Sequence, residues 1–210
     1  MARRVQPERI LKRKTEFRVV KTVIKVFCEG IVTEHHYFNA LRDLPEVKDR
    51  AAVDLWLVKD NGVPMTLVNR ACASKKSSDE VDEFWCIFDV EAKADKPGRH
   101  PNLHEALDKA KANGIGVAVS NPSFEVWLAL HLHADPVPTA FLTTDAATKI
   151  RQRLDGSAGK EVDGHKYMPH RRLARERAEA LERKHYLDGT VFPENNPSST
   201  VFRLMASIEP

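Results

Sequence analysis

Four short apolar runs alternate with segments of helical periodicity between residues 18 and 132. The runs are rich in β-branched and aromatic residues, as buried strands are, and cover residues 18–28, 52–59, 84–90 and 115–119. A segment with helical spacing of apolar residues follows each run, over residues 33–41, 64–75, 103–112 and about 120–132. This alternation predicts an α/β fold in three layers, with a mainly parallel four-stranded sheet and helices on both faces. In the last of these helices, Pro122 is expected in the first turn.

The pattern changes at residues 134–138, where two prolines interrupt it. Helical segments are predicted beyond that point, over residues 144–154, 171–186 and 199–208, with a flexible loop at residues 155–164. We therefore expect three regions along the chain. They are a basic amino-terminal arm (residues 1–17), an α/β core (residues 18–133) and a helical extension packed on that core (residues 134–210).

The composition excludes several classes of protein. Charged residues make up 30% of the 210 residues, and no apolar stretch approaches the roughly 20 residues that a membrane span requires. The first residues are charged rather than apolar, so we expect no secretory signal, no membrane partner and a cytoplasmic location. The three cysteines have no close pairing and are expected to be small core residues.

Positive charge is concentrated at the amino terminus. Residues 1–25 carry nine Lys or Arg against two Glu, so this segment has a charge of +7 in a chain of net charge +3. A basic arm on a slightly acidic body favours a polyanionic partner such as nucleic acid. A solvated tail explains the same pattern equally well, and charge alone does not decide between the two interpretations.

Acidic residues follow two of the predicted strands directly. Glu29 comes after residues 23–28, and Asp89 and Glu91 come after residues 84–88. Because the carboxyl ends of parallel strands open onto one crevice, these side chains are expected to face each other there. Glu34 and Glu125 lie at helix starts near the same edge, where they equally fit the role of charges that complement the helix dipole. Clustered carboxylates need a cation between them, and hard oxygen ligands favour Mg²⁺ or Mn²⁺.

The segments around these carboxylates share residues with a known family. They are Phe27–Glu34 with Tyr37 and Phe38, Phe88–Glu91, Ser120–Leu128 with His131, and Asn196–Val201. In this order, over residues 18–205, the chain resembles the RloB family, which is associated with restriction-modification and abortive-infection loci. The core of that family is similar to the Toprim fold of topoisomerases, primases and OLD-type nucleases.

The resemblance implies roles for individual residues. Glu29 takes the place of the general acid or base, and Asp89 and Glu91 take the place of the Asp-x-Asp pair that holds Mg²⁺. Two positions depart from the Toprim pattern, because Glu91 is one methylene longer than aspartate and Glu34 lies one residue further from Glu29 than usual. The predicted catalytic residues are Glu29 and Asp89, and the predicted metal ligands are Glu29, Glu34, Asp89, Glu91 and Glu125.

Phosphodiester cleavage also needs groups that hold the substrate. Divalent ions can supply charge compensation at phosphorus and an activated water, while basic side chains bind the flanking backbone. The predicted substrate-binding residues are Asn121, His165, Lys166, Tyr167, Arg171 and Arg172. For the basic residues from position 171 onward, a solvated helix with interleaved glutamates is the competing interpretation.

The sequence therefore predicts a metal-dependent nuclease that acts on DNA or RNA in antiphage defence. The alternative is a non-catalytic module that binds nucleic acid or a nucleotide signal and acts with a partner ATPase, by analogy with the gene neighbourhoods of the family. The chain has no Walker A loop, dinucleotide fingerprint or His-Glu-x-x-His motif, so nucleotide hydrolysis, redox chemistry and zinc proteolysis have no support. The choice between DNA and RNA and between monomer and homo-oligomer stays open.

Overall fold

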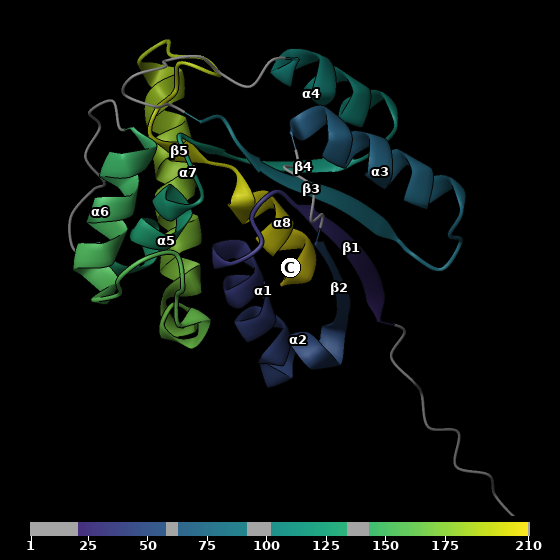
Figure 1. Ribbon diagram of the computed structural model, residues 1–210, viewed down its shortest axis with the longest axis horizontal. Coiled ribbons are helices and arrows are strands. Elements are labelled where there is room, and N and C mark those ends of the chain that lie inside the picture. Colours follow the sequence, from purple (N-terminus) through teal and green to yellow (C-terminus); the bar gives the residue numbers. More distant parts are fainter. Residues whose placement is uncertain (1–20, 58–62, 92–101, 134–142, 210) are drawn as a thin grey trace, which may run out of the picture.

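A twisted sheet forms the centre of the computed structural model, which describes residues 21–57, 63–91, 102–133 and 143–209 (Figure 1). In spatial order the strands are β2 (Ala51–Leu57), β1 (Thr22–Cys28), β3 (Glu83–Asp89), β4 (Gly116–Asn121) and β5 (Ser198–Ser199). The first four are parallel, and β5 pairs with β4 in the antiparallel direction. The predicted α/β class with a mainly parallel sheet is confirmed, while the short strand β5 was not predicted.

A helix follows each of the four parallel strands, and further helices follow in the carboxyl-terminal third. Their bounds are α1 (Thr33–Asp43), α2 (Pro45–Arg50), α3 (Pro64–Lys76), α4 (Leu103–Ala112), α5 (Glu125–Leu132), α6 (Thr144–Asp155), α7 (Arg171–Leu187) and α8 (Val201–Ile208). Two short 3-10 turns, Gly164–Lys166 and Met168–His170, precede α7. Helix α2 was not predicted. Across the described ranges, no helix has both the length and the apolar character needed to cross a lipid bilayer.

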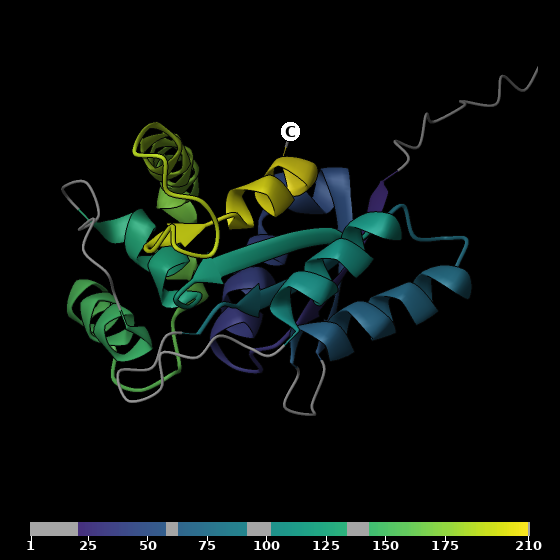
Figure 2. The same cartoon turned by 90° about the horizontal axis from the view of Figure 1, so that it is seen from above.

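Two apolar clusters hold helices against opposite faces of the sheet. On one face, Leu67 of α3 and Ala106 of α4 pack with Phe27 and Phe88. On the other, helices α1, α5, α7 and α8 pack against the side chains of Ile24, Val26, Ile87 and Ala118. Figures 1 and 2 show α3 and α4 on one side of the sheet and α1 and α8 on the other. All three cysteines are buried, as expected for core residues.

The carboxyl-terminal third shares the second of these clusters. Tyr167, Ala174 and Leu204 belong to the same buried group as Tyr37 and Trp127. The predicted boundary near residue 133 therefore does not separate two apolar cores. The amino-terminal arm, residues 1–17, lies outside the described residues, so its predicted role is not addressed by the fold.

The prediction that Pro122 lies in the first turn of a helix is wrong. Strand β4 extends through Asn121 because Ser120 and Asn121 pair with Ser199 and Ser198 of β5. The Asn121–Pro122 peptide bond is cis, and α5 begins only at Glu125. The antiparallel pairing with a segment more than seventy residues away extends the strand, which the local sequence pattern did not indicate.

The buried residues of α5 should contribute strongly to the stability of this arrangement. We expect Leu128→Ala to lower the free energy of unfolding by about 2–5 kcal/mol, because Leu128 is completely buried and its loss leaves a cavity. The matched control is Leu187→Ala at the end of α7, where the side chain is 82% exposed and the change should stay within about 0.5 kcal/mol. Urea unfolding followed by circular dichroism measures both, and equal effects would contradict the burial of Leu128 in the core.

Candidate carboxylate site

Glu29 and Asp89 lie side by side at the carboxyl edge of the sheet. The pairing of β1 with β3 continues one residue beyond β1, where the backbone N–H of Glu29 donates to the carbonyl oxygen of Ile87 at 3.1 Å. The Oε2 atom of Glu29 in turn accepts a hydrogen bond from the backbone N–H of Asp89 at 3.4 Å. Two acidic residues sixty positions apart are thus neighbours, as the sequence analysis expected from parallel pairing.

One oxygen of the Asp89 carboxylate, Oδ1, is buried and makes no hydrogen bond within the described ranges. Burial raises the pKa of Asp89 well above its ordinary value, and the charges of Glu34, Glu125 and Glu29 raise it further. A buried carboxylate oxygen without a partner is costly, and a proton or a cation would relieve that cost.

Glu34 has the most buried side chain of the five predicted acidic ligands. It lies in the first turn of α1, is 6% exposed, and its carboxylate lies over Gly30, where a Cβ atom would come within 1.9 Å of Oε2. Burial raises the pKa of Glu34 to about 7, with Glu125 and Glu29 raising it and Lys160 lowering it. A carboxylic acid that is half protonated near neutral pH is well suited to proton transfer.

Glu125 and Glu91 complete the set of predicted ligands. Glu125 opens α5 and acts electrostatically on both Glu34 and Asp89. Glu91 has a φ of 54°, in the left-handed region, and its backbone N–H donates to the carbonyl oxygen of Pro122 at 2.9 Å. Such a conformation in a residue other than glycine costs about 1–3 kcal/mol and is often found at functional sites. Four of the five predicted ligands thus act on one another electrostatically, and the fifth follows Asp89 by two residues.

These residues do not form a complete metal cage by themselves. Among the residues that the structure describes, no group of three or more His, Cys, Asp or Glu side chains could hold a metal ion. Mg²⁺, however, usually keeps several waters and binds through one or two carboxylates together with substrate phosphates. Oxygen donors and the unpartnered Oδ1 atom of Asp89 fit that mode of binding.

The predicted substrate-binding residues have different environments. Asn121 is buried and its amide donates to the carbonyl oxygen of Pro193 at 2.8 Å. Tyr167 is completely buried, and its hydroxyl donates to Oδ2 of Asp155 at 2.5 Å. Both side chains therefore have structural partners and are not surface contacts. His165 and Lys166 are exposed, although the ammonium group of Lys166 donates to the carbonyl oxygen of Asp155.

Arg171 and Arg172 lie away from the carboxylates. Arg171 donates to both carboxylate oxygens of Glu209 at 2.8 Å and to Glu46 of α2 at 2.7 Å. Helix α1 runs from Glu34 towards α2, and its eleven residues span about 16 Å. Arg172 lines a cavity of about 380 Å³ in the same region together with Arg50 and Arg175, but four glutamates also line it. The structure thus does not bring Arg171 and Arg172 to the carboxylate site.

Lys160 is a charged residue near the site that the sequence pattern did not indicate. Lys160 acts on the Glu34 carboxylate, and its backbone carbonyl accepts a hydrogen bond from the Thr33 hydroxyl at 2.9 Å. The residue lies in the loop that the sequence pattern assigned as flexible, and a lysine in a glycine-rich loop does not by itself indicate a functional site. The contact that brings it to the site spans 127 residues of sequence, so local patterns could not indicate it.

Comparisons with known proteins identify one family. A family model described as RloB-like protein matches residues 24–208, which includes every described helix and strand except the first residues of β1. No curated protein and no solved structure matches the chain. The match covers the carboxylate site, the strands that form its edge and the helical carboxyl-terminal third.

Glu34 should make the stability of the metal-free protein depend on pH. Because its folded pKa of about 7 exceeds its ordinary value of 4.5, the stability that its protonated form contributes is lost as pH rises between these values. We expect Glu34→Gln to be more stable than the wild type at pH 8, by up to about 3 kcal/mol, and to lose this advantage towards pH 4.5. Urea unfolding in EDTA at several pH values measures the difference. The exposed Glu80→Gln is the control, and a difference independent of pH would contradict the assignment.

The contact between Gly30 and Glu34 can be tested with a double-mutant cycle. Gly30→Ala should destabilise the protein by about 1–3 kcal/mol, because the added methyl group meets the Glu34 carboxylate. The φ of Gly30 is not positive, so the backbone conformation adds no penalty of its own. In a Glu34→Ala background the same substitution should cost less than about 0.5 kcal/mol. An equal cost in both backgrounds, measured by urea unfolding, would show that the two residues do not interact.

Proposed function

The chain belongs to the RloB-like protein family, and on that basis we propose that it is a metal-dependent nuclease with a Toprim-like core, which cleaves DNA or RNA in antiphage defence. The observation that supports this best is that Glu29 and Asp89 are neighbours at the carboxyl edge of adjacent parallel strands, where the backbone N–H of Asp89 donates to Oε2 of Glu29. Parallel α/β folds bind ligands at this edge of the sheet. The buried, unpartnered oxygen of Asp89 supplies an independent reason to place a cation there.

The roles of the residues follow from their positions. Asp89 and Glu29 would hold a divalent ion, Mg²⁺ or Mn²⁺, with Glu91 and Glu125 next to it. The ion would supply charge compensation at the phosphorus atom and an activated water. Glu29, by its resemblance to the Toprim pattern, would move the proton, and Glu34 is a further group able to do so because its pKa of about 7 permits either protonation state at neutral pH.

Two properties of the site explain why a metal would be needed. A cluster of carboxylates creates a negative potential that repels a phosphodiester, so a cation bound between them would strengthen the binding of a nucleic acid. Their burial also makes the charged forms of Asp89 and Glu34 unfavourable in the absence of a cation. A divalent ion would relieve both effects at once. An ion bound only to native protein would also raise its melting temperature by mass action.

Substitution of the paired acids tests the proposal. Glu29→Gln and Asp89→Asn should each lower the cleavage rate by at least about 100-fold, while the circular dichroism spectrum stays unchanged. Matched controls are Glu80→Gln and Asp79→Asn, whose side chains are exposed in the turn before β3. Cleavage of plasmid, single-stranded DNA and transfer RNA is followed in Mn²⁺ and in EDTA.

The outcomes separate the two functional classes. If Glu29→Gln and Asp89→Asn cleave as the controls do, the carboxylate site is not the nuclease centre. If the wild type binds nucleic acid in EDTA and never cleaves it, with or without a partner ATPase, the non-catalytic module is the better description. An unchanged melting temperature in Mg²⁺, Mn²⁺ and Ca²⁺ would argue against any metal site.

A further inference from the structure

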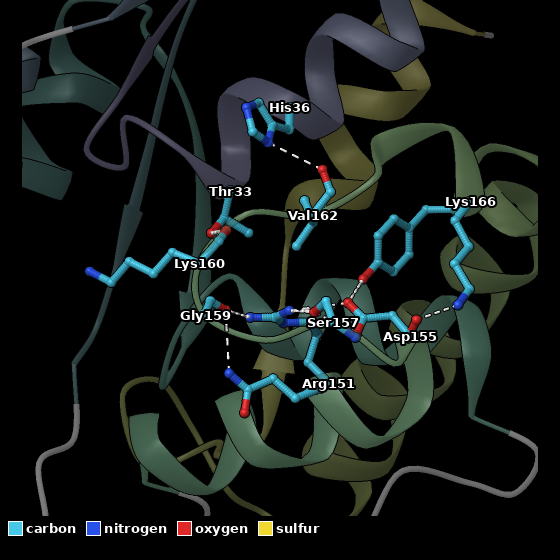
Figure 3. A network of polar contacts seen from close by, with 11 residues as sticks. Thr33, His36, Arg151, Asp155, Ser157, Gly159, Lys160, Val162 and Lys166 are labelled. Atoms are coloured by element: carbon cyan, nitrogen blue, oxygen red, sulfur yellow. Dashed lines mark hydrogen bonds and ion pairs between the residues drawn. The ribbon is translucent and has the colours of Figure 1, made fainter.

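The segment between α6 and the first 3-10 turn, residues 156–163, lies along the start of α1 (Figure 3). We call it the strap. The Thr33 hydroxyl donates to the carbonyl oxygen of Lys160 at 2.9 Å, and Nδ1 of His36 lies 3.1 Å from the carbonyl oxygen of Val162. The side chain of Val162 is buried in the apolar cluster below. The strap is thus docked on the same helical turn that carries Glu34.

A buried ion pair holds the strap from its other side. Arg151 of α6 is completely buried, and it donates to Oδ2 of Asp155 at 3.1 Å and to the carbonyl oxygen of Gly159 at 2.6 Å. Asp155 in turn accepts from the backbone N–H of Ser157 at 2.8 Å and from the Tyr167 hydroxyl. Figure 3 shows these contacts on one side of the strap and those of Thr33 and His36 on the other. The main chain at Gly159 and Lys160 is therefore fixed in two directions.

The side chain of Lys160 is not used by these anchors. It is exposed, and in Figure 3 it extends away from the Arg151–Asp155 network. Its ammonium group acts on the Glu34 carboxylate, yet within the described parts of the chain it forms no ion pair. A cation whose main chain is anchored next to the turn that carries Glu34, and which forms no ion pair within the described residues, is available to an incoming anion.

We propose that Lys160 is a substrate-binding residue of the carboxylate site, where its ammonium group contacts a backbone phosphate of the bound nucleic acid. The inference rests on the proposed function in taking nucleic acid as the ligand. Lysine is suited to this contact because its ammonium is a compact point charge on a flexible stem, which can follow a phosphate without fixed geometry. The strap acts as the positioning element, and it brings this charge from the helical extension to the edge of the sheet.

A contact between Lys160 and a phosphate would also reduce the electrostatic repulsion between the substrate and the acids of the site. A phosphodiester that approaches the site meets repulsion from those of its acids that are ionised. Contacts with lysine and arginine supply most of the non-specific affinity of proteins for nucleic acids. Arg171 pairs with Glu46 beyond the far end of α1, whereas the charge of Lys160 acts directly on the Glu34 carboxylate. Lys160 is therefore placed to offset part of that repulsion.

Binding in the absence of metal tests Lys160 separately from cleavage. The probe is a short fluorescein-labelled oligodeoxythymidylate, titrated with the full chain in EDTA at several salt concentrations. Lys160→Met should weaken binding by about 3–10-fold and reduce the slope of log K against log salt by about 0.7, the value for one phosphate contact on a single strand. Lys160→Arg should restore most of the affinity. The control is Lys149→Met, which removes the same charge from the exposed surface of α6 and should leave both quantities unchanged.

The anchors of the strap involve the main-chain oxygen atoms of Gly159, Lys160 and Val162, so the Lys160 side chain can be changed without removing them. If Lys160→Met binds as tightly as Lys149→Met, with the same salt slope, the assignment is wrong. A cleavage assay in Mn²⁺ on the same samples separates the two proposals. A wild type that binds but never cleaves would overturn the nuclease while the Lys160 contact stands. A wild type that does not bind the probe in EDTA but cleaves in Mn²⁺ would overturn the Lys160 contact alone, and one that neither binds nor cleaves would overturn both.

Discussion

The register between β1 and β3 is the constraint on which the site depends. Strand residues alternate between faces, so Ile24 and Val26 contact the cluster with α1 while Phe27 contacts the cluster with α3. A slip of one residue would move each side chain to the opposite face, and burial on both faces opposes it. The same register brings the N–H of Asp89 to Oε2 of Glu29. Apolar packing on the two faces of the sheet thus makes Glu29 and Asp89 neighbours, although their carboxylates take no part in that packing.

Helix dipoles partly offset the mutual repulsion of the carboxylates. Helices α1 and α5 both begin at the site, so the positive ends of their dipoles favour Glu34 and Glu125. The core beneath them adds no charge at His131, because burial lowers the pKa of that residue to about 3 and keeps its ring neutral beside the Tyr37 hydroxyl, 3.2 Å away. Among the described residues, the acids, the two helix dipoles and Lys160 all contribute to the electrostatics of the site. Such a site is poised to bind positive charge.

The sequence indicated the parts of the molecule that local patterns control. Alternating strands and helices, the buried cysteines and the proximity of Glu29 and Asp89 all follow from short-range periodicity combined with the rule that parallel strands end at one edge. The errors have long-range causes. Strand β4 extends through Asn121 because β5, from a distant segment, pairs with it. Tyr167 and Arg171 pair with Asp155, Glu46 and Glu209, partners that no local pattern connects to them, while their contact with substrate stays a prediction.

The most consequential long-range contact makes the helical extension part of the site. The α/β strands, α1 and α5 supply the acids, whereas the strap supplies a cation, Lys160, and is held in place by Arg151, whose guanidinium is completely buried. Burying an arginine is costly unless its donors find partners. The two Nη atoms of Arg151 donate to Asp155 and to the carbonyl of Gly159, whereas its buried Nε has no partner among the described residues. The charged network thus fixes the conformation of the strap. The strap lies next to Glu34 because the carbonyl oxygen of Lys160 accepts a hydrogen bond from Thr33. The contacts that order the strap therefore also place the charge of Lys160 near the Glu34 carboxylate.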